Sequence, residues 1–192
     1  MSLKESQVKK QTLYISIAAS LLIGFVCGVL YSSLQTPSSI SAEEHIHDEA
    51  VAAIVSLEQQ TRNNPDDFEA WVQLGHAYFD SDQPNNAIIA YKKALELVPG
   101  NMNVMTDLGV MYRRNKQPKE AIATFDKVLQ QDPNHEQARF NKGVVLLSDL
   151  DDRKAAIAEW KKLVAINPFA KTPSGTTVKE LISQLENQAH NN

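Results

Sequence analysis

The residue types most typical of a metal site in this chain are those of His45, His47 and Glu49, because imidazole and carboxylate groups are common metal ligands. Their spacing argues against such a site. Residues two positions apart in a helix point to different sides, so only His45 and Glu49 share a face. We interpret this acidic stretch as the solvated start of a helix, where carboxylates interact favourably with its positive end. No metal site is expected.

No other pattern in the sequence indicates catalysis. It contains no glycine-rich phosphate loop, no paired cysteines and no nucleophile motif. The single cysteine, Cys27, excludes an internal disulfide and a covalent c-type haem, which needs two cysteines beside a histidine. The formal net charge of −4 argues against nucleic acid as the main partner. We expect a protein that is not an enzyme and needs no cofactor.

Prolines recur at a nearly fixed interval, which indicates a structural repeat. Pro65, Pro99, Pro133 and Pro168 lie 34, 34 and 35 residues apart. A period in this range is typical of one supersecondary unit copied along the chain, with each copy stacked on its neighbours. Small and aromatic residues keep the same register: Gly75, Gly109 and Gly143, then Tyr91, Phe125 and Trp160. No segment alternates like a strand, so the predicted fold class is all-α.

The repeat resembles the tetratricopeptide repeat (TPR) family, which has two antiparallel helices per 34 residues. The residues that match the family pattern are Trp71, Leu74, Gly75, Tyr78, Ala87, Tyr91, Ala94 and Pro99. The resemblance implies a solenoid of about three helix pairs within residues 43–192. We expect repeats at 68–101, 102–135 and 136–170, preceded by a half-repeat helix within 43–66.

The third copy departs from the simple pattern at two places. Arg139 and Lys142 replace its first two apolar positions, and one extra residue falls within Ser148 to Arg153. Two helices are still predicted there. A C-terminal helix at 176–189, capped by Thr176, is predicted to cover the last unit. The alternative is a regulatory helix that folds into the groove.

In TPR proteins the first helix of each pair lines the concave surface, and this implies a binding groove. Counting from the packing stripe, the predicted groove residues are Val72, His76 and Phe79, then Thr106, Val110 and Arg113, then Phe140, Val144 and Leu147. A mainly apolar groove indicates a polypeptide partner, either an amphipathic helix or an extended peptide. The alternative is that some of these residues pack under the C-terminal helix.

The same positions argue against one kind of ligand. TPR proteins that clamp an acidic C-terminus place Lys and Asn in this groove, whereas this chain has Val72, His76, Thr106 and Asp107 there. We expect an apolar peptide with one acidic contact to Arg113 or Arg114.

An uncharged stretch near the N-terminus, Leu13 to Tyr31, predicts a transmembrane helix, because about 20 apolar residues span a bilayer. Lysines precede it and no Lys or Arg follows until Arg62, so residues 1–10 are expected in the cytoplasm. The predicted layout is an anchor at 11–32, a linker at 33–42 and an exported domain, as in a single-pass protein of the bacterial inner membrane with its domain in the periplasm.

Three alternatives concern this segment. The first is a cleaved signal peptide, although its apolar region is usually shorter. The second is lipid attachment at Cys27. The third is a homodimer that forms through Gly24 and Gly28, whose G-x-x-x-G spacing lets two membrane helices approach closely.

The start of the first repeat narrows the resemblance. Its NPDD-x-x-AW motif, Asn64 to Trp71, is similar to that of the membrane-anchored TPR subunits of bacterial cytochrome c maturation. That resemblance implies a protein that holds apocytochrome c for haem attachment. The other hypothesis is a structural scaffold that joins subunits of an envelope complex.

Overall fold

The computed structural model describes residue 25 and residues 39–190, and the side chains from Glu49 to Gln188. The predicted transmembrane segment, apart from Phe25, lies outside the described residues, as do the linker up to Ser38 and the side chains of His45 and His47. Among the helices that are described, none is long and apolar enough to cross a membrane. The chain divides into two units, Met1–Glu49 and Ala50–Asn192, and the helix pairs belong to the second.

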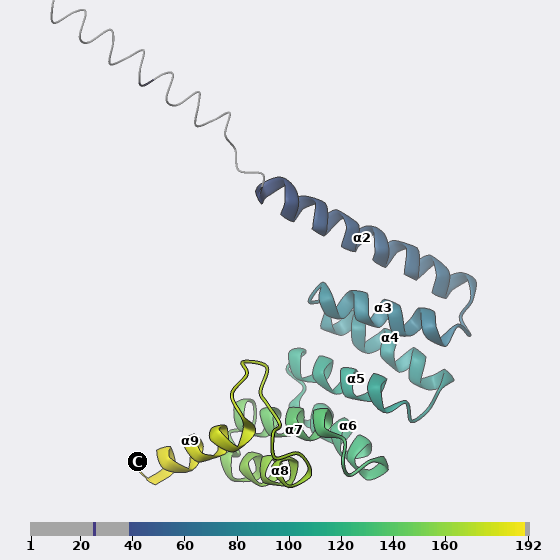
Figure 1. Ribbon diagram of the computed structural model, residues 1–192. Coiled ribbons are helices and arrows are strands. Elements are labelled where there is room, and N and C mark those ends of the chain that lie inside the picture. The colour runs from purple at the N-terminus through teal and green to yellow at the C-terminus, as the bar shows by residue number, and fades with distance from the viewer. Residues whose placement is uncertain (1–24, 26–38, 191–192) are drawn as a thin grey trace, which may run out of the picture. The chain divides into compact units, whose positions relative to one another are not determined.

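Eight helices account for nearly all of residues 39–190, and no strand longer than an isolated bridge occurs among these residues. The helices are α2 (Ser39–Asn63), α3 (Phe68–Asp80), α4 (Pro84–Leu97), α5 (Met102–Arg114), α6 (Pro118–Gln131), α7 (Glu136–Ser148), α8 (Arg153–Ile166) and α9 (Val178–His190). Consecutive helices from α3 to α9 pack against each other, which gives three antiparallel pairs and a final helix (Figure 1). The all-α solenoid expected from the repeats is confirmed.

Each pair is held together by the same glycine and aromatic contact, which fixes how closely its two helices approach. Gly75 lies against the ring of Tyr91, Gly109 against Phe125 and Gly143 against Trp160. A Cβ atom at Gly109 would lie 2.5 Å from the Phe125 ring, so there is no room for a side chain. Tyr91, Phe125 and Trp160 are each almost completely buried. The period in the sequence therefore corresponds to one repeated packing contact.

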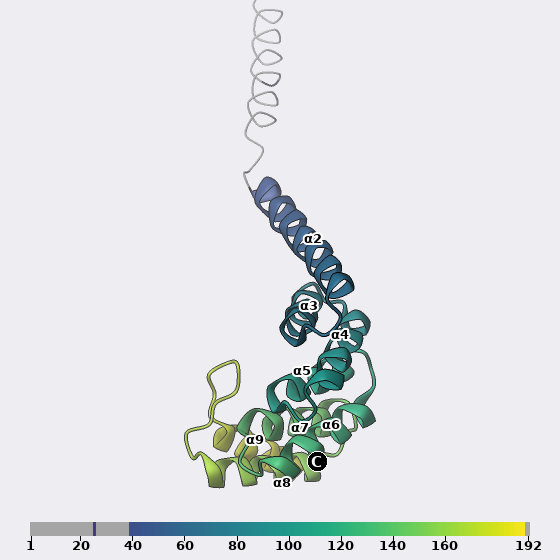
Figure 2. The same ribbon diagram turned by 90° about the vertical axis from the view of Figure 1, so that its right-hand side faces the viewer.

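The helix boundaries follow from local chemistry that is also repeated. Asp67 and Asn101 cap α3 and α5, because their side-chain oxygens accept hydrogen bonds from the N–H groups of Ala70 and Val104. Pro84 and Pro118 open α4 and α6, as the sequence indicates. Figure 2 shows the same array turned by 90° about the vertical axis.

The extra residue of the third copy lies in the turn between α7 and α8. This turn has four residues, 149–152, whereas the equivalent turns at 81–83 and 115–117 have three. Each turn contains one residue with positive φ, at Asp82, Lys116 and Asp151. The insertion therefore changes the turn and leaves the packing of both helices intact.

The two ends of the array are closed by single helices. Ile54 of α2 is buried in the same cluster as Leu74 and Tyr78 of α3. At the other end Val178, Ile182 and Leu185 of α9 are buried in one cluster with Trp160 and Leu163 of α8, as expected of a cap.

The cap residue of α9 is Thr177, so the prediction of Thr176 is wrong. The Thr177 hydroxyl accepts a hydrogen bond from the N–H of Glu180 (3.2 Å), and the Glu180 carboxylate accepts one from the N–H of Thr177 (3.1 Å). This reciprocal arrangement needs an acidic residue three positions after the cap. Thr177 has Glu180 at that position, whereas Thr176 has Lys179.

Candidate functional site

The nine residues predicted to line the groove do lie on α3, α5 and α7, but they are not equally accessible. Val72 and Thr106 are buried, with exposed fractions of 8% and 1%. The Thr106 hydroxyl donates a hydrogen bond to the backbone oxygen of Met102 in its own helix. These two side chains therefore contribute to packing and offer little surface to a ligand. The other seven are half-buried or exposed: His76, Phe79, Val110, Arg113, Phe140, Val144 and Leu147. We call these seven residues the first-helix face.

The apolar members of this face divide into two groups. Phe79 and Val110 are half-buried and pack against the core formed by α2 to α5. Phe140, Val144 and Leu147 pack against the cluster that contains Val178 and Ile182 of α9. The Phe140 ring also stacks on Trp160, with 6.0 Å between ring centroids. The third-copy residues thus contribute to the packing of the C-terminal end of the array.

Charged pairs connect neighbouring units beside these apolar side chains. The His76 ring lies 3.3 Å from the Asp107 carboxylate, which joins α3 to α5. Arg113 donates to Asp149 at 2.6 Å, and Asp149 belongs to the four-residue turn that carries the insertion. The Arg114 guanidinium lies over the Phe79 ring, 4.2 Å from its centroid. The predicted acidic contact of Arg113 is thus supplied within the chain.

Burial changes the pKa values of two groups near the contact between His76 and Asp107. Burial raises the pKa of the Asp107 carboxyl, an effect that the hydrogen bond from His76 reduces but does not cancel. Burial, with a smaller contribution from Asp107, also raises the pKa of the Tyr91 phenol. The Tyr91 hydroxyl has no hydrogen-bond partner among the described residues.

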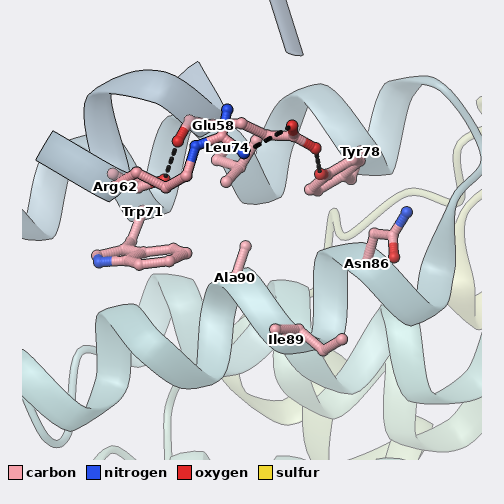
Figure 3. A pocket seen from close by; sticks show the side chains of 9 residues that line it. Glu58, Arg62, Trp71, Leu74, Tyr78, Asn86, Ile89 and Ala90 are labelled. Atoms are coloured by element: carbon pink, nitrogen blue, oxygen red, sulfur yellow. Dashed lines mark hydrogen bonds and ion pairs between the residues drawn. The ribbon is translucent and has the colours of Figure 1, made fainter. Parts of the chain in front are cut away.

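A second set of surface features lies between successive second helices. The α2–α4 groove has a volume of about 280 Å³, with Trp71, Leu74 and Tyr78 of α3 as its floor (Figure 3). The Tyr78 hydroxyl donates to Glu58 on α2 at 2.5 Å. Burial, with this hydrogen bond, raises the pKa of Tyr78 to about 12. The polar groups at this groove are thus already paired.

The α4–α6 groove is larger, about 600 Å³. It lies one repeat further along, and α5 forms its floor through Met105, Leu108 and Tyr112. Lys92 of α4 and Lys127 of α6 line its sides. Glu96 of α4 also lines it and pairs with Lys93 at 2.7 Å. The groove therefore combines an apolar floor with walls that carry two lysines and one paired glutamate.

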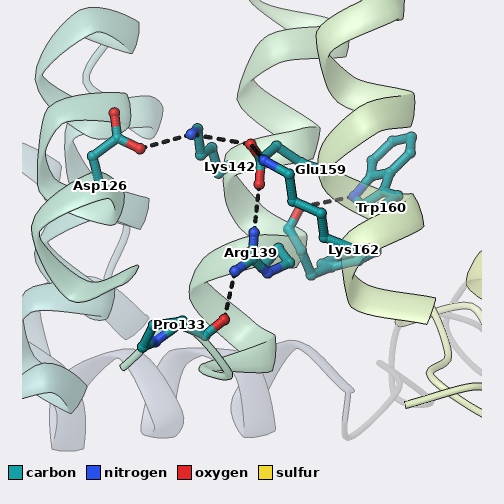
Figure 4. Close-up of polar contacts among 8 residues, drawn as sticks. Asp126, Pro133, Arg139, Lys142, Glu159, Trp160 and Lys162 are labelled. Carbon is teal, nitrogen blue, oxygen red and sulfur yellow. Dashed lines mark hydrogen bonds and ion pairs between the residues drawn. The ribbon is translucent and has the colours of Figure 1, made fainter. Parts of the chain in front are cut away.

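The third position in this series, between α6 and α8, is filled by a charged network (Figure 4). Glu159 accepts from Arg139 at 2.8 Å, from Lys142 at 3.3 Å and from Lys162 at 2.9 Å. Lys142 also pairs with Asp126 at 2.7 Å. Arg139 and Glu159 are each only 7% exposed, so the charges are largely shielded from water. Arg139 and Lys142 are accommodated because carboxylates on both neighbouring helices meet them.

The network changes the titration of its members. Burial favours the neutral form of Glu159, but the hydrogen bond from Lys162 and the charge of Lys142 outweigh it, so the pKa of Glu159 lies below its usual value. Burial would lower the pKa of Lys142, but the hydrogen bond to Asp126 and the charge of Glu159 outweigh it, so this pKa is raised. Both groups are therefore charged near neutral pH.

Arg139 and Lys142 stand out in the sequence as departures from the repeat, whereas Glu159 and Asp149 were not predicted. Glu159 occupies the position of Ala90 and Thr124 in the other copies, which both face a neighbouring unit from within the array. The sequence did carry a signal for this contact: a carboxylate occupies this position in the same copy that has two additional cations, Arg139 and Lys142. Asp149 could not be assigned because it lies in the inserted turn, where the repeat register is lost.

The fold places the protein among the TPR proteins. Solved structures that resemble it include MamA, with 22% identity and a TM-score of 0.60 over 67% of this chain and 74% of that one. A second is a TPR protein from Parabacteroides merdae ATCC 43184, with 18% identity and a TM-score of 0.62 over 79% and 59% of the two chains. At these identities the similarity establishes the fold alone.

The sequence identifies the family more narrowly than the fold does. Residues 35–171 match the family described as the cytochrome c-type biogenesis protein H TPR domain, and the chain belongs to that family. No curated protein matches the chain. The resemblance inferred from the first repeat is thus confirmed over most of the chain.

Proposed function

We propose that the protein binds a polypeptide on its first-helix face and holds it for haem attachment during cytochrome c maturation. Membership of the cytochrome c-type biogenesis family is the observation that carries this proposal. The half-buried Phe79 and Val110 support it, because apolar side chains in adjacent units offer anchor points for one continuous ligand. The client would be apocytochrome c, held through its C-terminal helix as the family resemblance implies.

Two solved TPR structures support a peptide ligand by analogy. YrrB, described as a TPR protein with an unusual peptide-binding site, has 23% identity and a TM-score of 0.60 over 65% of this chain and 64% of that one. The first TPR of Spaghetti (RPAP3), described as bound to the HSP90 peptide SRMEEVD, has 15% identity and a TM-score of 0.56 over 64% and 93%. In this chain Val72 and Thr106 are buried, so we favour an apolar ligand over a carboxylate clamp.

We also propose the location and the domain layout. Residues 11–32 anchor the protein in the bacterial inner membrane, residues 33–42 form a linker, and residues 43–192 form the TPR domain in the periplasm. The uncharged segment and the lysines before it support this arrangement. Such an anchor would keep the bound client close to membrane enzymes.

Titration of the full-length protein with the C-terminal helix of a c-type apocytochrome from the same cell tests the proposed client. Phe79→Ser is expected to weaken binding by about tenfold or more, as truncation of an interface aromatic commonly does. Phe169→Ser is the matched control, because Phe169 is 82% exposed, follows α8 in the chain and is not one of the first-helix face residues. Phe140 is unsuitable for this test, since it stacks on Trp160 and its truncation would disturb the core.

The outcomes separate the two roles considered from the sequence. Saturable binding that Phe79→Ser weakens and Phe169→Ser leaves unchanged supports the client-holding role. No binding by the intact protein, with co-purification of other envelope subunits, contradicts it and favours the scaffold.

A further inference from the structure

The three positions between successive second helices are built from equivalent residues, so they can be compared directly. Asp126, Lys142 and Glu159 of the filled third position correspond to Lys92, Leu108 and Thr124 of the α4–α6 groove. Lys162 corresponds to Lys127. The offsets are 34 residues before the inserted turn and 35 after it. The charged network therefore shows how the fold can occupy a groove of this kind.

The α4–α6 groove has no carboxylate at the place of Glu159, and Glu96, which also lines it, is paired with Lys93. In the third position Glu159 accepts hydrogen bonds from two lysines, Lys142 and Lys162. In the α4–α6 groove Thr124 occupies the place of Glu159, and its hydroxyl is bonded to the backbone oxygen of Glu120 in its own helix. Lys92 and Lys127 line this groove and have no ion-pair partner among the described residues. Two cations thus line the same groove as Thr124, the position that holds a carboxylate one repeat later.

The floor of the groove determines what else a ligand must offer. Leu95, Met105, Leu108 and Tyr112 line it, and its volume is about 600 Å³. This space accommodates two or three apolar side chains. An acidic group alone would leave the floor open to water, whereas an apolar segment alone would leave both lysines without a partner.

We propose that the α4–α6 groove is a second protein-binding surface, which docks a helical segment of a partner protein through apolar side chains and one glutamate or aspartate. The partner carboxylate lies between Lys92 and Lys127, in the place that Glu159 takes in the third position. This surface is formed by α4, α5 and α6 through residues that are not part of the first-helix face. The protein can therefore contact a partner here while it holds a client there.

A pair of synthetic helical peptides tests the proposal against the full-length protein in a mild non-ionic detergent. One carries leucines at positions i, i+3 and i+7 with a central glutamate, and the other has glutamine in place of the glutamate. The glutamate peptide is expected to bind saturably and at least about tenfold more tightly, with an affinity that falls as salt increases. Equal affinity for the two peptides, or no saturable binding, would overturn the proposal.

Substitutions then locate the binding surface. Thr124→Glu supplies the carboxylate from within the chain and is expected to abolish peptide binding. The double variant Lys92→Gln/Lys127→Gln removes both cations. It keeps the proposal testable even if Thr124→Glu does not fold. Lys119→Gln is the matched control, because this exposed lysine of α6 does not line the groove.

Phe79→Ser distinguishes this surface from the client-binding face. The proposal requires that Phe79→Ser and Lys119→Gln leave peptide affinity within about twofold of the unmodified protein. If Phe79→Ser removes binding while the double lysine variant retains it, the peptide occupies the first-helix face and the second surface does not exist.

Discussion

At the scale of single residues, the third unit depends on one carboxylate. Glu159 meets Arg139, Lys142 and Lys162, and both it and Arg139 are almost inaccessible to water. Buried ion pairs contribute little compared with apolar packing, but removal of one partner leaves an uncompensated charge. The stability of the third unit therefore depends on this charge network, whereas the other two units have no equivalent network among the described residues.

We expect Glu159→Gln to lower the free energy of unfolding by about 3 kcal/mol, because Arg139 then lies buried without its carboxylate. Chemical denaturation of the full-length protein measures this change. Glu96→Gln is the control: Glu96 pairs with Lys93 on an exposed surface, so its loss should cost less than about 1 kcal/mol. A Glu159→Gln effect as small as that of the control would contradict the structural role of the network.

The same residue predicts a pH dependence. The folded protein holds the pKa of Glu159 below its usual value of 4.5, so its stabilising contribution is complete above that value. As the pH falls through 4.5 toward the lowered pKa, the carboxylate becomes protonated and this contribution is lost. The stability difference between the unmodified protein and Glu159→Gln should therefore be constant near neutral pH and shrink in acid.

At the scale of helices, the close contact between Gly109 and Phe125 is the most constrained packing point in the middle of the array. Gly109→Leu is expected to destabilise the protein by about 1 to 3 kcal/mol, because its side chain must displace the Phe125 ring. Ala123→Leu, at an exposed position of α6, is the control and should leave the thermal midpoint nearly unchanged. Equal midpoints for both variants would be inconsistent with this packing.

The start of α9 gives a second prediction at this scale. Thr177→Ala removes the hydroxyl that caps Glu180 and should cost about 1 kcal/mol, whereas Thr176→Ala should cost much less. Thermal unfolding of the two neighbouring variants compares them directly. A larger effect at Thr176 would restore the cap inferred from the sequence.

Helices and their packing were largely predictable because the repeat places the same residue types at the same spacing. Gly75, Gly109 and Gly143 each identify a helix crossing, and the aromatic residue 16 or 17 positions later identifies its partner. The cap at Thr177 was not predictable from residue type, because Thr176 and Thr177 are adjacent and identical in type. Only the hydrogen-bond geometry shows which of them caps α9. The Glu159 network and the pair of Arg113 with Asp149 could not be predicted in this way. Each involves a residue that departs from the repeat, so the repeat pattern does not indicate which residue it contacts.

The binding groove predicted on α3, α5 and α7 shows the same limit of prediction from a repeat pattern. Helical spacing correctly assigned its nine residues to α3, α5 and α7. It did not reveal that Val72 and Thr106 are buried, because accessibility depends on how far one unit rotates on the next. That rotation is a property of the whole interface.

At the scale of the whole molecule, the proposed topology makes a direct prediction. A reporter enzyme that is active only outside the cytoplasm, fused after Asn192, should be active, and the protein should remain with membranes after alkaline washing. The basis is the absence of Lys and Arg between Lys10 and Arg62. An inactive fusion would reverse the orientation, and release into the soluble periplasm would favour a cleaved signal peptide.

The network between α6 and α8 also restricts how this array could have grown by duplication. Lys142 depends on Asp126 from the unit before it, so the third unit is matched to its predecessor. If residues 136–170 were copied in tandem, Lys161 would take the place of Asp126 and face the lysine of the new copy, with like charges opposed. The second unit has Leu108 at this position and carries Asp126 itself, so it could be repeated without that conflict. A tandem copy of the third unit would thus oppose like charges at its new junction, whereas a copy of the second unit would not.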